Sequence, residues 1–428
     1  MLEKGNKKII NAWAFYDWAN SSYPLVITTA IFPLFYEATT GSMVNGVKTD
    51  LVTLFGRTFH NTELYDYTIA LSFLIVSIFT PLLSGIADYS GSKRKFMQFF
   101  CYLGSLSCAS LYFFDQSHLG LSLFTIMLTS VGFWGSLVFY NAFLPEIAEP
   151  ADHDRVSAKG YSLGYIGSSI LLVLNLIAIQ VFHMDPKWSF VSVAIWWMGF
   201  AQITFARLPN NVYGRKPEGN VIFKGFRELY KVWKELKEIS RLKRYLASFF
   251  IYSMGVQTVM IIAVPFASKE IFPPDQKGNL IIAVLIIQFL GVGGSILFSR
   301  LSKWIGNIKA LGVSIFIWIG ICIGTYLWVF TPTGFYVVAA LVGLVMGGIQ
   351  SLSRSTYSKL LPETQDHASY FSFYDVCEKI GIAIGTLSFG LIEGLTGGMR
   401  NSILTLIAFF VVGFILLLTI PKSKAIEV

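Results

Sequence analysis

Residues 65–95 read YDYTIALSFLIVSIFTPLLSGIADYSGSKRK. The first 23 of them are mostly apolar, with Asp66 as their one charged residue, and about 20 predominantly apolar residues at a rise of ~1.5 Å cross a bilayer core ~30 Å thick. A polar loop with three consecutive basic residues, Lys93, Arg94 and Lys95, follows directly. The stretch therefore predicts a membrane-spanning helix that ends in a basic loop.

The same pattern recurs along the whole chain of 428 residues. Charged residues make up only 14% of it, against about 25% in soluble domains, and its mean hydropathy is +0.60. We therefore predict an all-α polytopic membrane protein with about twelve transmembrane helices. The expected spans are 12–38, 65–87, 95–114, 119–144, 159–182, 188–207, 243–270, 279–299, 308–330, 335–360, 368–394 and 401–420.

The distribution of Lys and Arg between the loops predicts the orientation. Most of these 33 residues fall on the side that carries both termini, and the longest basic stretch is 208–242. Positive charge favours the cytoplasmic side, so both termini are expected in the cytoplasm, and the membrane would be the inner (plasma) membrane if the source is a bacterium. The net charge of +8 is then a topological signal rather than a sign of nucleic-acid binding. We expect no cleavable signal peptide. The Lys and Arg residues expected outside are Lys48, Arg57, Lys187, Lys269, Lys277 and Arg400.

The expected loops divide the chain into residues 1–207, a first half of six helices, a cytoplasmic linker 208–242, and residues 243–428, a second half of six helices. In the linker, apolar residues recur at helical spacing between Lys and Glu, which is typical of an amphipathic helix at a membrane surface. This helix could serve as a spacer between the halves or as a regulatory partner site. The apolar residues are Phe226, Leu229, Tyr230, Trp233, Leu236 and Ile239.

The two halves resemble each other. Leu144-Pro145-Glu146 ends the fourth span and Leu361-Pro362-Glu363 ends the tenth, each after an upstream Tyr at the same offset. Six helices followed by six in parallel repeat is the plan of many secondary transporters, which bind their substrate between the halves near the middle of the membrane.

The loop after the second span resembles the signature loop of the major facilitator superfamily. Its residues are Gly85, Asp88, Gly91, Lys93 and Arg94. The resemblance implies that Asp88 helps to latch the cytoplasmic side. The corresponding loop of the second half, residues 299–306, is degenerate and carries Lys303 where an acid could stand, so we expect an asymmetric latch.

Three further segments resemble the vacuole effluxer-like family. They are Tyr16-Asp17-Trp18-Ala19-Asn20-Ser21, the stretch 155–167, and Gln350-Ser351-Leu352-Ser353-Arg354-Ser355, the last followed by Phe373-Tyr374-Asp375. Eukaryotic members of this family are linked to amino-acid efflux from vacuoles, and the resemblance implies a monomer. It suggests amino acids as substrates, although Lys379 and the long loop 39–64 depart from the pattern, and the role of that loop is open.

Charged side chains within spans are costly, about 2.5–3.5 kcal/mol on insertion scales, so each needs a reason. Asp17 and Asn20 share a helix face about 7 Å from the start of the first span, where they could bind a substrate amine or a proton, or form a cap or salt bridge. Arg354 could bind a substrate carboxylate, or it could snorkel or pair with an acid. Gln350 and Tyr357 share its face.

The eleventh span carries Asp375, Glu378 and Lys379 on one face. They could form a neutralised group that helps insertion, or a gate or proton relay. Tyr161 and Tyr165 could line a cavity, or they could pack against lipid or protein. The sequence contains no P-loop, no His-Glu-x-x-His, and only five His, so we expect no direct ATP drive, no metal, no cofactor and no enzymatic activity.

Together these features predict a secondary active transporter that moves a small solute by alternating access. An amino acid or short peptide is the expected substrate, export the expected direction, and protons the expected coupling ion, carried by Asp17, Asp375 or Glu378. The alternatives are an exporter of amphipathic drugs or lipids, and a membrane sensor or scaffold that transports nothing.

Overall fold

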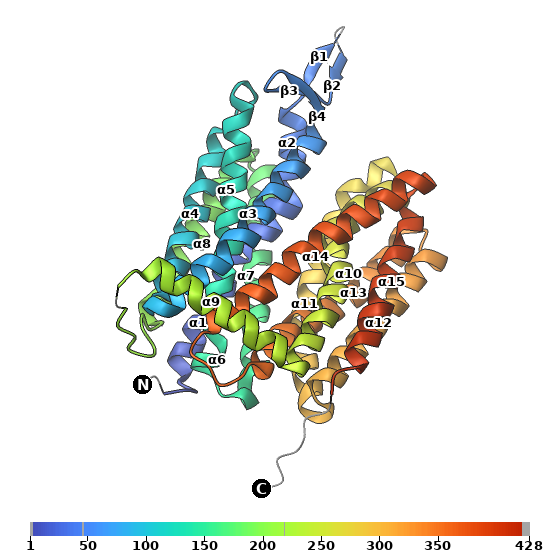
Figure 1. The fold of residues 1–428 in the computed structure, drawn as a ribbon. Helices are drawn as coiled ribbons and strands as arrows, with labels where there is room; N and C mark the ends of the chain where they lie inside the picture. Colours follow the sequence, from blue (N-terminus) through green and yellow to red (C-terminus); the bar gives the residue numbers. More distant parts are fainter. Residues whose placement is uncertain (1–2, 45–46, 218, 422–428) are drawn as a thin grey trace.

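A computed structural model describes residues 3–44, 47–217 and 219–421. Helices dominate it, as the apolar pattern predicts (Figure 1). The helices of the first half are α1 (Lys7–Asn20), η1 (Tyr23–Ile31), α2 (Phe32–Thr39), α3 (Asn61–Ser90), α4 (Lys93–Ser110), α5 (Leu119–Ala142), α6 (Leu144–Ile147), α7 (His153–Gln180) and α8 (Lys187–Arg207). Those that follow are α9 (Val221–Glu238), α10 (Ser240–Glu270), α11 (Leu280–Ile305), α12 (Asn307–Trp328), α13 (Pro332–Leu360), α14 (His367–Thr396) and α15 (Met399–Leu418). Short 3₁₀ turns are η2 (Leu111–Phe113), η3 (Gln116–His118), η4 (Pro150–Asp152) and η5 (Pro274–Asn279).

Within the described residues, ten helices are long and apolar enough to cross a membrane. The other two expected spans are also helical. The first is the run α1–η1–α2, and the eleventh is α14, whose charged residues lower its apolarity. The prediction of about twelve transmembrane helices is confirmed.

The first span differs from the regular helix that its sequence suggests. Between Tyr23 and Ile31 the backbone forms a π-helix of nine residues. Pro24 and Pro33 remove two backbone N–H donors in or beside this segment, so the ordinary α-helical hydrogen bonds cannot all form. Segments of π-helix are rare and frequently lie at functional sites.

The loop 39–64 contains two short β-hairpins, which the all-α prediction did not include. Strand β1 (Ser42–Val44) pairs with β2 (Val47–Thr49), and β3 (Leu51–Leu54) pairs with β4 (Arg57–His60), both antiparallel. The β-branched residues Val52, Thr53 and Thr58 favour strands, and Gly56 adopts a positive φ in the second turn.

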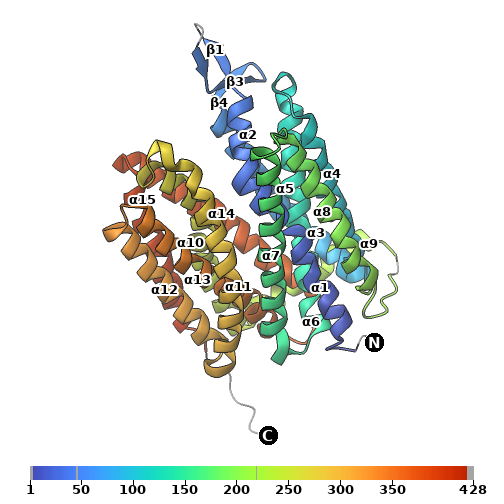
Figure 2. The same cartoon turned by 180° about the vertical axis from the view of Figure 1, so that it is seen from behind.

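The helices form two bundles, α1–α8 and α10–α15, joined by α9 (Figures 1 and 2). Helix α1 begins and α15 ends on the same face of the molecule, which we call the terminal face. The bundles lie against each other near this face, where α7 packs on α11 and α13, and α14 packs on α3 and α5. Toward the opposite face the bundles diverge (Figures 1 and 2).

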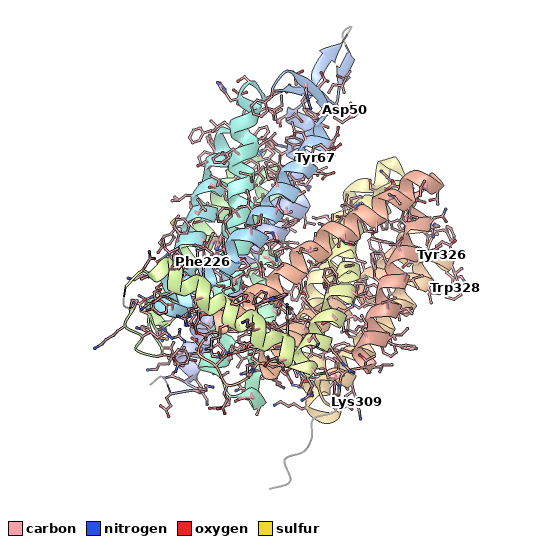
Figure 3. All side chains as sticks on the ribbon, viewed as in Figure 1. Asp50, Tyr67, Phe226, Lys309, Tyr326 and Trp328 are labelled. Carbon is pink, nitrogen blue, oxygen red and sulfur yellow. The ribbon has the colours of Figure 1, made fainter. Side chains whose placement is uncertain are left out.

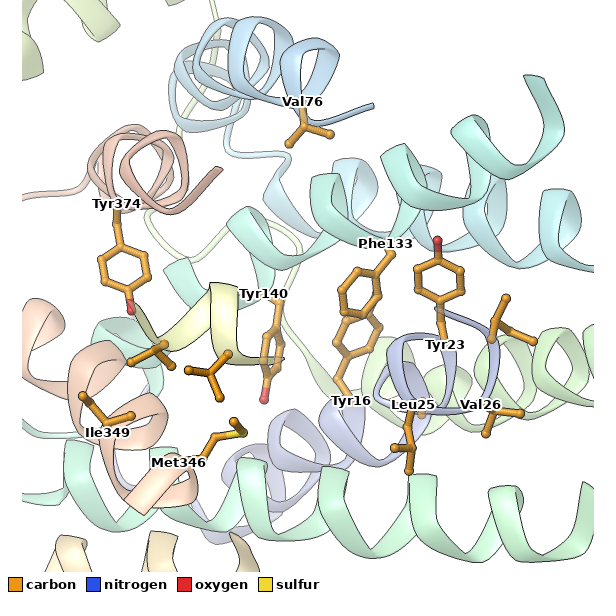
Figure 4. Close-up of a cluster of buried hydrophobic side chains, with 14 of the residues drawn as sticks. Tyr16, Tyr23, Leu25, Val26, Val76, Phe133, Tyr140, Met346, Ile349 and Tyr374 are labelled. Carbon is orange, nitrogen blue, oxygen red and sulfur yellow. The ribbon is translucent and has the colours of Figure 1, made fainter. Parts of the chain in front are cut away.

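Apolar side chains from both bundles meet where they touch. Figure 4 shows Tyr16 and Tyr140 of the first bundle in one cluster with Met346 and Ile349 of α13. All four side chains are buried. This contact places the charged residues of α1, α13 and α14 at the interface between the bundles.

Candidate functional site

Arg354 of α13 lies at the centre of the interface and is 1% exposed. Its Nη2 atom lies 3.2 Å from Oδ2 of Asp17 on α1, in the other bundle. It also donates through Nε to the Ser157 hydroxyl (2.9 Å), through Nη2 to the Ser157 carbonyl (2.9 Å) and through Nη1 to Asn141 (3.3 Å). The Tyr140 hydroxyl donates to the same oxygen of Asp17 at 2.7 Å. We call these five residues the central cluster.

Within the central cluster, the charges of Asp17 and Arg354, both buried in membrane-spanning helices, neutralise each other. Helix α1 begins at Lys7, so Asp17 lies about 15 Å along it, deeper than the 7 Å that the expected start at residue 12 gave. The aromatic rings of Trp13 and Tyr161 lie 4.9 Å and 4.3 Å from the guanidinium carbon of Arg354. In this conformation Arg354 pairs with an acid, which was one of the two roles expected for it.

Of the other residues that the sequence singled out near Asp17 and Arg354, all but Tyr357 lie close to the central cluster. The Tyr165 hydroxyl donates to Gln350 at 2.6 Å, across the interface. Asn20 is buried beside Ser21, whose hydroxyl lies 3.4 Å from its side-chain oxygen. Tyr357 lies apart, because its hydroxyl donates to the carbonyl of Tyr370 within the second bundle.

The charges of α14 form a second group, which we call the triad: Asp375, Glu378 and Lys379. The Lys379 ammonium lies 2.8 Å from a carboxylate oxygen of each acid. It also lies 3.6 Å from the ring centroid of Trp134 on α5, so the triad faces the first bundle. Gln257 of α10 donates to the other oxygen of Glu378 at 2.7 Å. With two acids and one base, the triad carries a net charge of −1 when all three are ionised.

A small pocket lined by both polar and apolar side chains lies between the triad and the central cluster. Its volume is about 20 Å³, enough for about one water molecule. Glu378, whose side chain is 18% exposed, reaches this pocket, and so does Gln350. The other lining residues are Tyr161, Phe249, Tyr252, Ser253, Val256, Gln257, Ile349, Ser353 and Tyr374. The pocket therefore offers the Tyr161 hydroxyl of the first bundle and hydroxyl, amide and carboxylate groups of the second.

The signature loop forms a contact that we call the first latch: Asp88, Lys93, Glu146 and His367. Asp88 accepts hydrogen bonds from the backbone N–H of Ala368 (3.2 Å) and from the N–H of the following residue (2.7 Å), both in the first turn of α14. Lys93 lies 3.8 Å from Asp88 and pairs closely with Glu146, which His367 contacts at 3.1 Å. An acid at a helix N-terminus is favoured by the helix dipole.

The other residues of the signature position the linker. Gly85 of α3 touches the backbone of Gly225 in α9, where a Cβ atom would collide with the carbonyl oxygen. Gly91 adopts a φ of +66°, which ends α3 in a left-handed turn. Arg94 donates to the carbonyl of Leu208 at 2.7 Å. Small residues and one guanidinium therefore bring the linker close to the loop.

A second contact, which we call the second latch, is formed by Asp154, Ser302, Asn307 and Lys359. Asp154 lies at the start of α7 and accepts hydrogen bonds from Ser302 (2.7 Å) and Asn307 (2.7 Å) at the loop between α11 and α12. The Lys359 ammonium lies 2.6 Å from the carboxylate of Asp154. Sequence reasoning missed all four residues, because each is an ordinary loop or helix-end polar residue until the bundles meet.

The linker adds a third connection near the terminal face. Arg215 donates to the carbonyl of Asp88 (2.8 Å) and to the carboxylate of Asp366 (2.7 Å). On α9, Lys231 lies 3.3 Å from Glu228 and 3.7 Å from Asp366. Partial burial and the nearby Asp366 carboxylate raise the pKa of Glu228, although Lys231 opposes the shift. Burial raises the pKa of Tyr213 in the linker to about 12.

Among the described residues, no group of three or more His, Cys, Asp or Glu side chains is arranged to hold a metal ion. The polar residues at the interface instead form ion pairs and hydrogen bonds between two bundles that could separate. Such an arrangement can hold one conformation closed and release it when a charge is neutralised.

Comparison with known proteins gives matches along the whole chain. The family model of the vacuole effluxer Atg22-like proteins matches residues 5–427. The MFS-type transporter YxiO of Bacillus subtilis is 32% identical over 98% of this chain and 96% of its own length. Autophagy-related protein 22 of Eremothecium gossypii is 24% identical over 98% of this chain and 91% of its own.

Solved structures of the same superfamily share the fold. The human organic anion transporter MFSD10 superposes with a TM-score of 0.73 at 11% identity and covers 97% of this chain and 100% of its own. A bacterial homologue of the iron transporter ferroportin, in an outward-facing state with soaked iron, gives 0.68 at 10% identity, covering 97% and 99%. FucP, in an outward conformation, gives 0.66 at 14% identity, covering 98% and 99%.

These matches agree with a fold of two six-helix bundles. The protein is an integral, multi-pass membrane protein with the fold of a secondary transporter. The chain therefore belongs to the vacuole effluxer Atg22-like family, within the major facilitator superfamily.

Proposed function

We propose that the protein exports a small zwitterionic solute, such as an amino acid or a short peptide, in exchange for protons. The bundles would alternate between the present arrangement, closed at the terminal face, and one closed at the opposite face. The proposal places the termini in the cytoplasm, in agreement with the basic loops of the sequence. The effluxer family to which the chain belongs supports the direction.

The observation that carries this proposal is the net charge of the triad beside a pocket that Glu378 lines. An uncompensated charge within a membrane is costly, so the triad favours one additional positive charge. A proton on Asp375 or Glu378, or the ammonium group of a substrate, would supply it. Glu378 is the group placed for this exchange, because it reaches the pocket, whereas Lys379 is fully buried between the two acids.

Competition for this charge would couple the two fluxes. A substrate ammonium and a proton that neutralise the same site cannot occupy it together, so binding of one favours release of the other. In the central cluster, by contrast, Asp17 and Arg354 already neutralise each other, and the cluster is buried in the closed arrangement. Arg354 would meet a substrate carboxylate only after its bonds to Asp17 open.

The pocket supports this proposal over the export of amphipathic drugs or lipids. Its lining is mixed, but it contains hydroxyl, amide and carboxylate groups that would bind the charged ends of a small zwitterion. A sensor or scaffold that transports nothing remains the contrasting outcome of the flux experiment below.

The test is solute flux in proteoliposomes loaded with a mixed pool of amino acids and dipeptides, with and without an imposed pH gradient. We expect selective, gradient-driven movement that Glu378→Gln and Asp375→Asn abolish, since neither variant can exchange a proton at that position. Glu393→Gln, at the far end of the same helix and paired with Lys269, serves as the control and retains flux. Unchanged flux in both triad variants would overturn the coupling role.

The central cluster can be tested with the same vesicles. If Arg354 binds a substrate carboxylate during the cycle, Arg354→Lys weakens transport of carboxylate-bearing substrates more than that of their amides, because an ammonium lacks the planar fork of a guanidinium. An equal loss for both would assign Arg354 to the ion pair with Asp17 alone.

A further inference from the structure

An apolar groove lies on the outside of the second bundle, between α9, α10 and α14. Its volume is about 330 Å³, within the range of ligand sites. It uses a different face of α10 from the pocket at Glu378, since Lys243, Ala247 and Phe250 follow one another at helical spacing along it. The complete lining is Trp233, Leu236, Lys243, Leu246, Ala247, Phe250, Phe373, Val376 and Cys377.

Helix α9, which forms one wall of the groove, has two apolar faces. One face packs on α3, where Gly225 touches Gly85 and Ile86. The other leaves large apolar side chains exposed, such as Phe223 (78%) and Phe226 (43%, Figure 3). Exposed apolar side chains on an amphipathic helix of a membrane protein are typical of a helix that lies in the lipid headgroup region. The groove therefore opens to the bilayer, not to water.

Basic side chains surround the mouth of this groove. Lys243, at the start of α10, donates to the carbonyl of Lys237 at 3.3 Å. Lys237 and Lys234 lie over the rings of Trp233 and Tyr230, 4.5 Å and 4.7 Å from the centroids, so their ammonium groups extend toward the surface. Two ammonium groups beside the open end of an apolar groove match the phosphate and acyl chain of a phospholipid.

We propose that the groove binds one acyl chain of an anionic phospholipid from the surrounding bilayer, with Lys237 and Lys243 holding its phosphate. The bound lipid would tie α9 to α10 and α14. The same end of α9 contacts α14 through Glu235, which accepts a hydrogen bond from Tyr370 at 2.9 Å, and through the Trp233–Phe373 ring contact. An occupied groove therefore stabilises the arrangement in which the linker bridges the two bundles.

The test is native mass spectrometry of the purified full-length protein, titrated in detergent with either phosphatidylglycerol or phosphatidylcholine. We expect one phosphatidylglycerol to be retained in preference to phosphatidylcholine. Lys243→Gln removes one basic contact and weakens this binding about five-fold, the equivalent of roughly 1 kcal/mol per basic residue. Ala247→Trp fills the groove and abolishes it, because Ala247 is a small, exposed residue on the groove wall.

Matched variants elsewhere separate this site from general attraction to lipid. Lys309→Gln removes an exposed basic residue on the terminal face away from the groove, and Ala408→Trp enlarges an exposed residue on α15. Both should retain the lipid. Equal retention of the two lipids would overturn the headgroup assignment, and retention by Ala247→Trp would overturn the assignment of the acyl chain. The readout is binding, so it is independent of whether the protein exports amino acids.

Discussion

The two latches occupy equivalent places in the two halves but use opposite chemistry. In the first, the last turn of α3 supplies the acid, Asp88, and the facing helix α14 supplies N–H donors. In the second, the end of α11 and the start of α12 supply donors, Ser302 and Asn307, and the facing helix α7 supplies the acid, Asp154. The two halves therefore meet at equivalent positions, but the carboxylate stands on the helix end before the short loop in the first latch and on the facing helix in the second.

The repeated Leu-Pro-Glu sequence shows the same asymmetry. Glu146 is 1% exposed and contacts Lys93 and His367. Its counterpart Glu363 is exposed. Identical residues at equivalent positions thus have different roles, because only one of them meets a basic partner on the facing elements. The first latch is more deeply buried than the second, where the Lys359 side chain is 23% exposed, so we expect it to contribute more to closure.

The largest expected effect comes from Asp88→Asn. The variant puts an amide NH₂ where a carboxylate oxygen accepts a backbone N–H of α14, which leaves a buried donor without an acceptor, and it removes the charge near Lys93. Each such loss costs about 1–3 kcal/mol. Spin-label distances across the terminal face, measured by double electron–electron resonance, should show this face open in most molecules. Glu63→Gln, at the other end of α3, is the control, and a distance distribution like that of the unmodified protein in Asp88→Asn would refute the latch.

Asp154→Asn should have a smaller effect on the same distances. The amide oxygen can still accept a hydrogen bond from Ser302 or Asn307, so the loss is mainly the charge that pairs with Lys359, about 1–2 kcal/mol. We expect a partial shift toward opening. A larger shift than that of Asp88→Asn would reverse the order of the two latches.

The docking of α9 should weaken as the pH rises. The pKa of Glu228 is raised above its ordinary value of 4.5 when α9 is docked. At a pH just above 4.5, Glu228 therefore holds a proton more often when α9 is docked than when it is released. Raising the pH through this window removes the proton and leaves a disfavoured carboxylate beside Asp366. Hydrogen exchange of α9 amides, corrected for the intrinsic rate, should therefore speed up with pH, and Glu228→Gln should reduce this dependence. Equal pH dependence in both proteins would contradict the assignment.

The smallest effect is expected at Lys303, the basic residue in the degenerate loop of the second half. Its side chain is exposed, whereas Ser302 beside it is buried and bonded to Asp154. Lys303→Gln should change closure by less than about 0.5 kcal/mol. A loss comparable to that of Asp154→Asn would show that the charge of Lys303 belongs to the second latch.

Much of the fold could be predicted from sequence, because span length and apolarity are properties of each segment alone. The π-helix from Tyr23 to Ile31 and the hairpins in 39–64 could not, since they depend on backbone hydrogen bonds that no apolar pattern reports. The charged residues of the candidate site were identifiable because charge within a span is rare.

Their partners were harder to predict than the charges themselves. Asp17 and Arg354 are 337 residues apart and meet only when the bundles pack together. The residues of the second latch, including Asp154, carry no signal within their own segments, because a charged or polar residue at a helix end is ordinary. Tyr357 was grouped with Arg354 by helical spacing, but its hydroxyl bonds within the second bundle, because one helix face can contact several neighbours.

The central claim is that the two bundles close at the terminal face through these latches and open there as the opposite face closes. The most direct test is a pair of spin-label distances in proteins whose four native cysteines are replaced by alanine: Lys95 to Lys309 across the terminal face, and Ser117 to Thr396 across the opposite face, each site changed to cysteine. The account predicts that Asp88→Asn lengthens the first distance and shortens the second in the same molecules. Lengthening of the first with no change in the second would show local unfolding of the latch and would contradict alternating access.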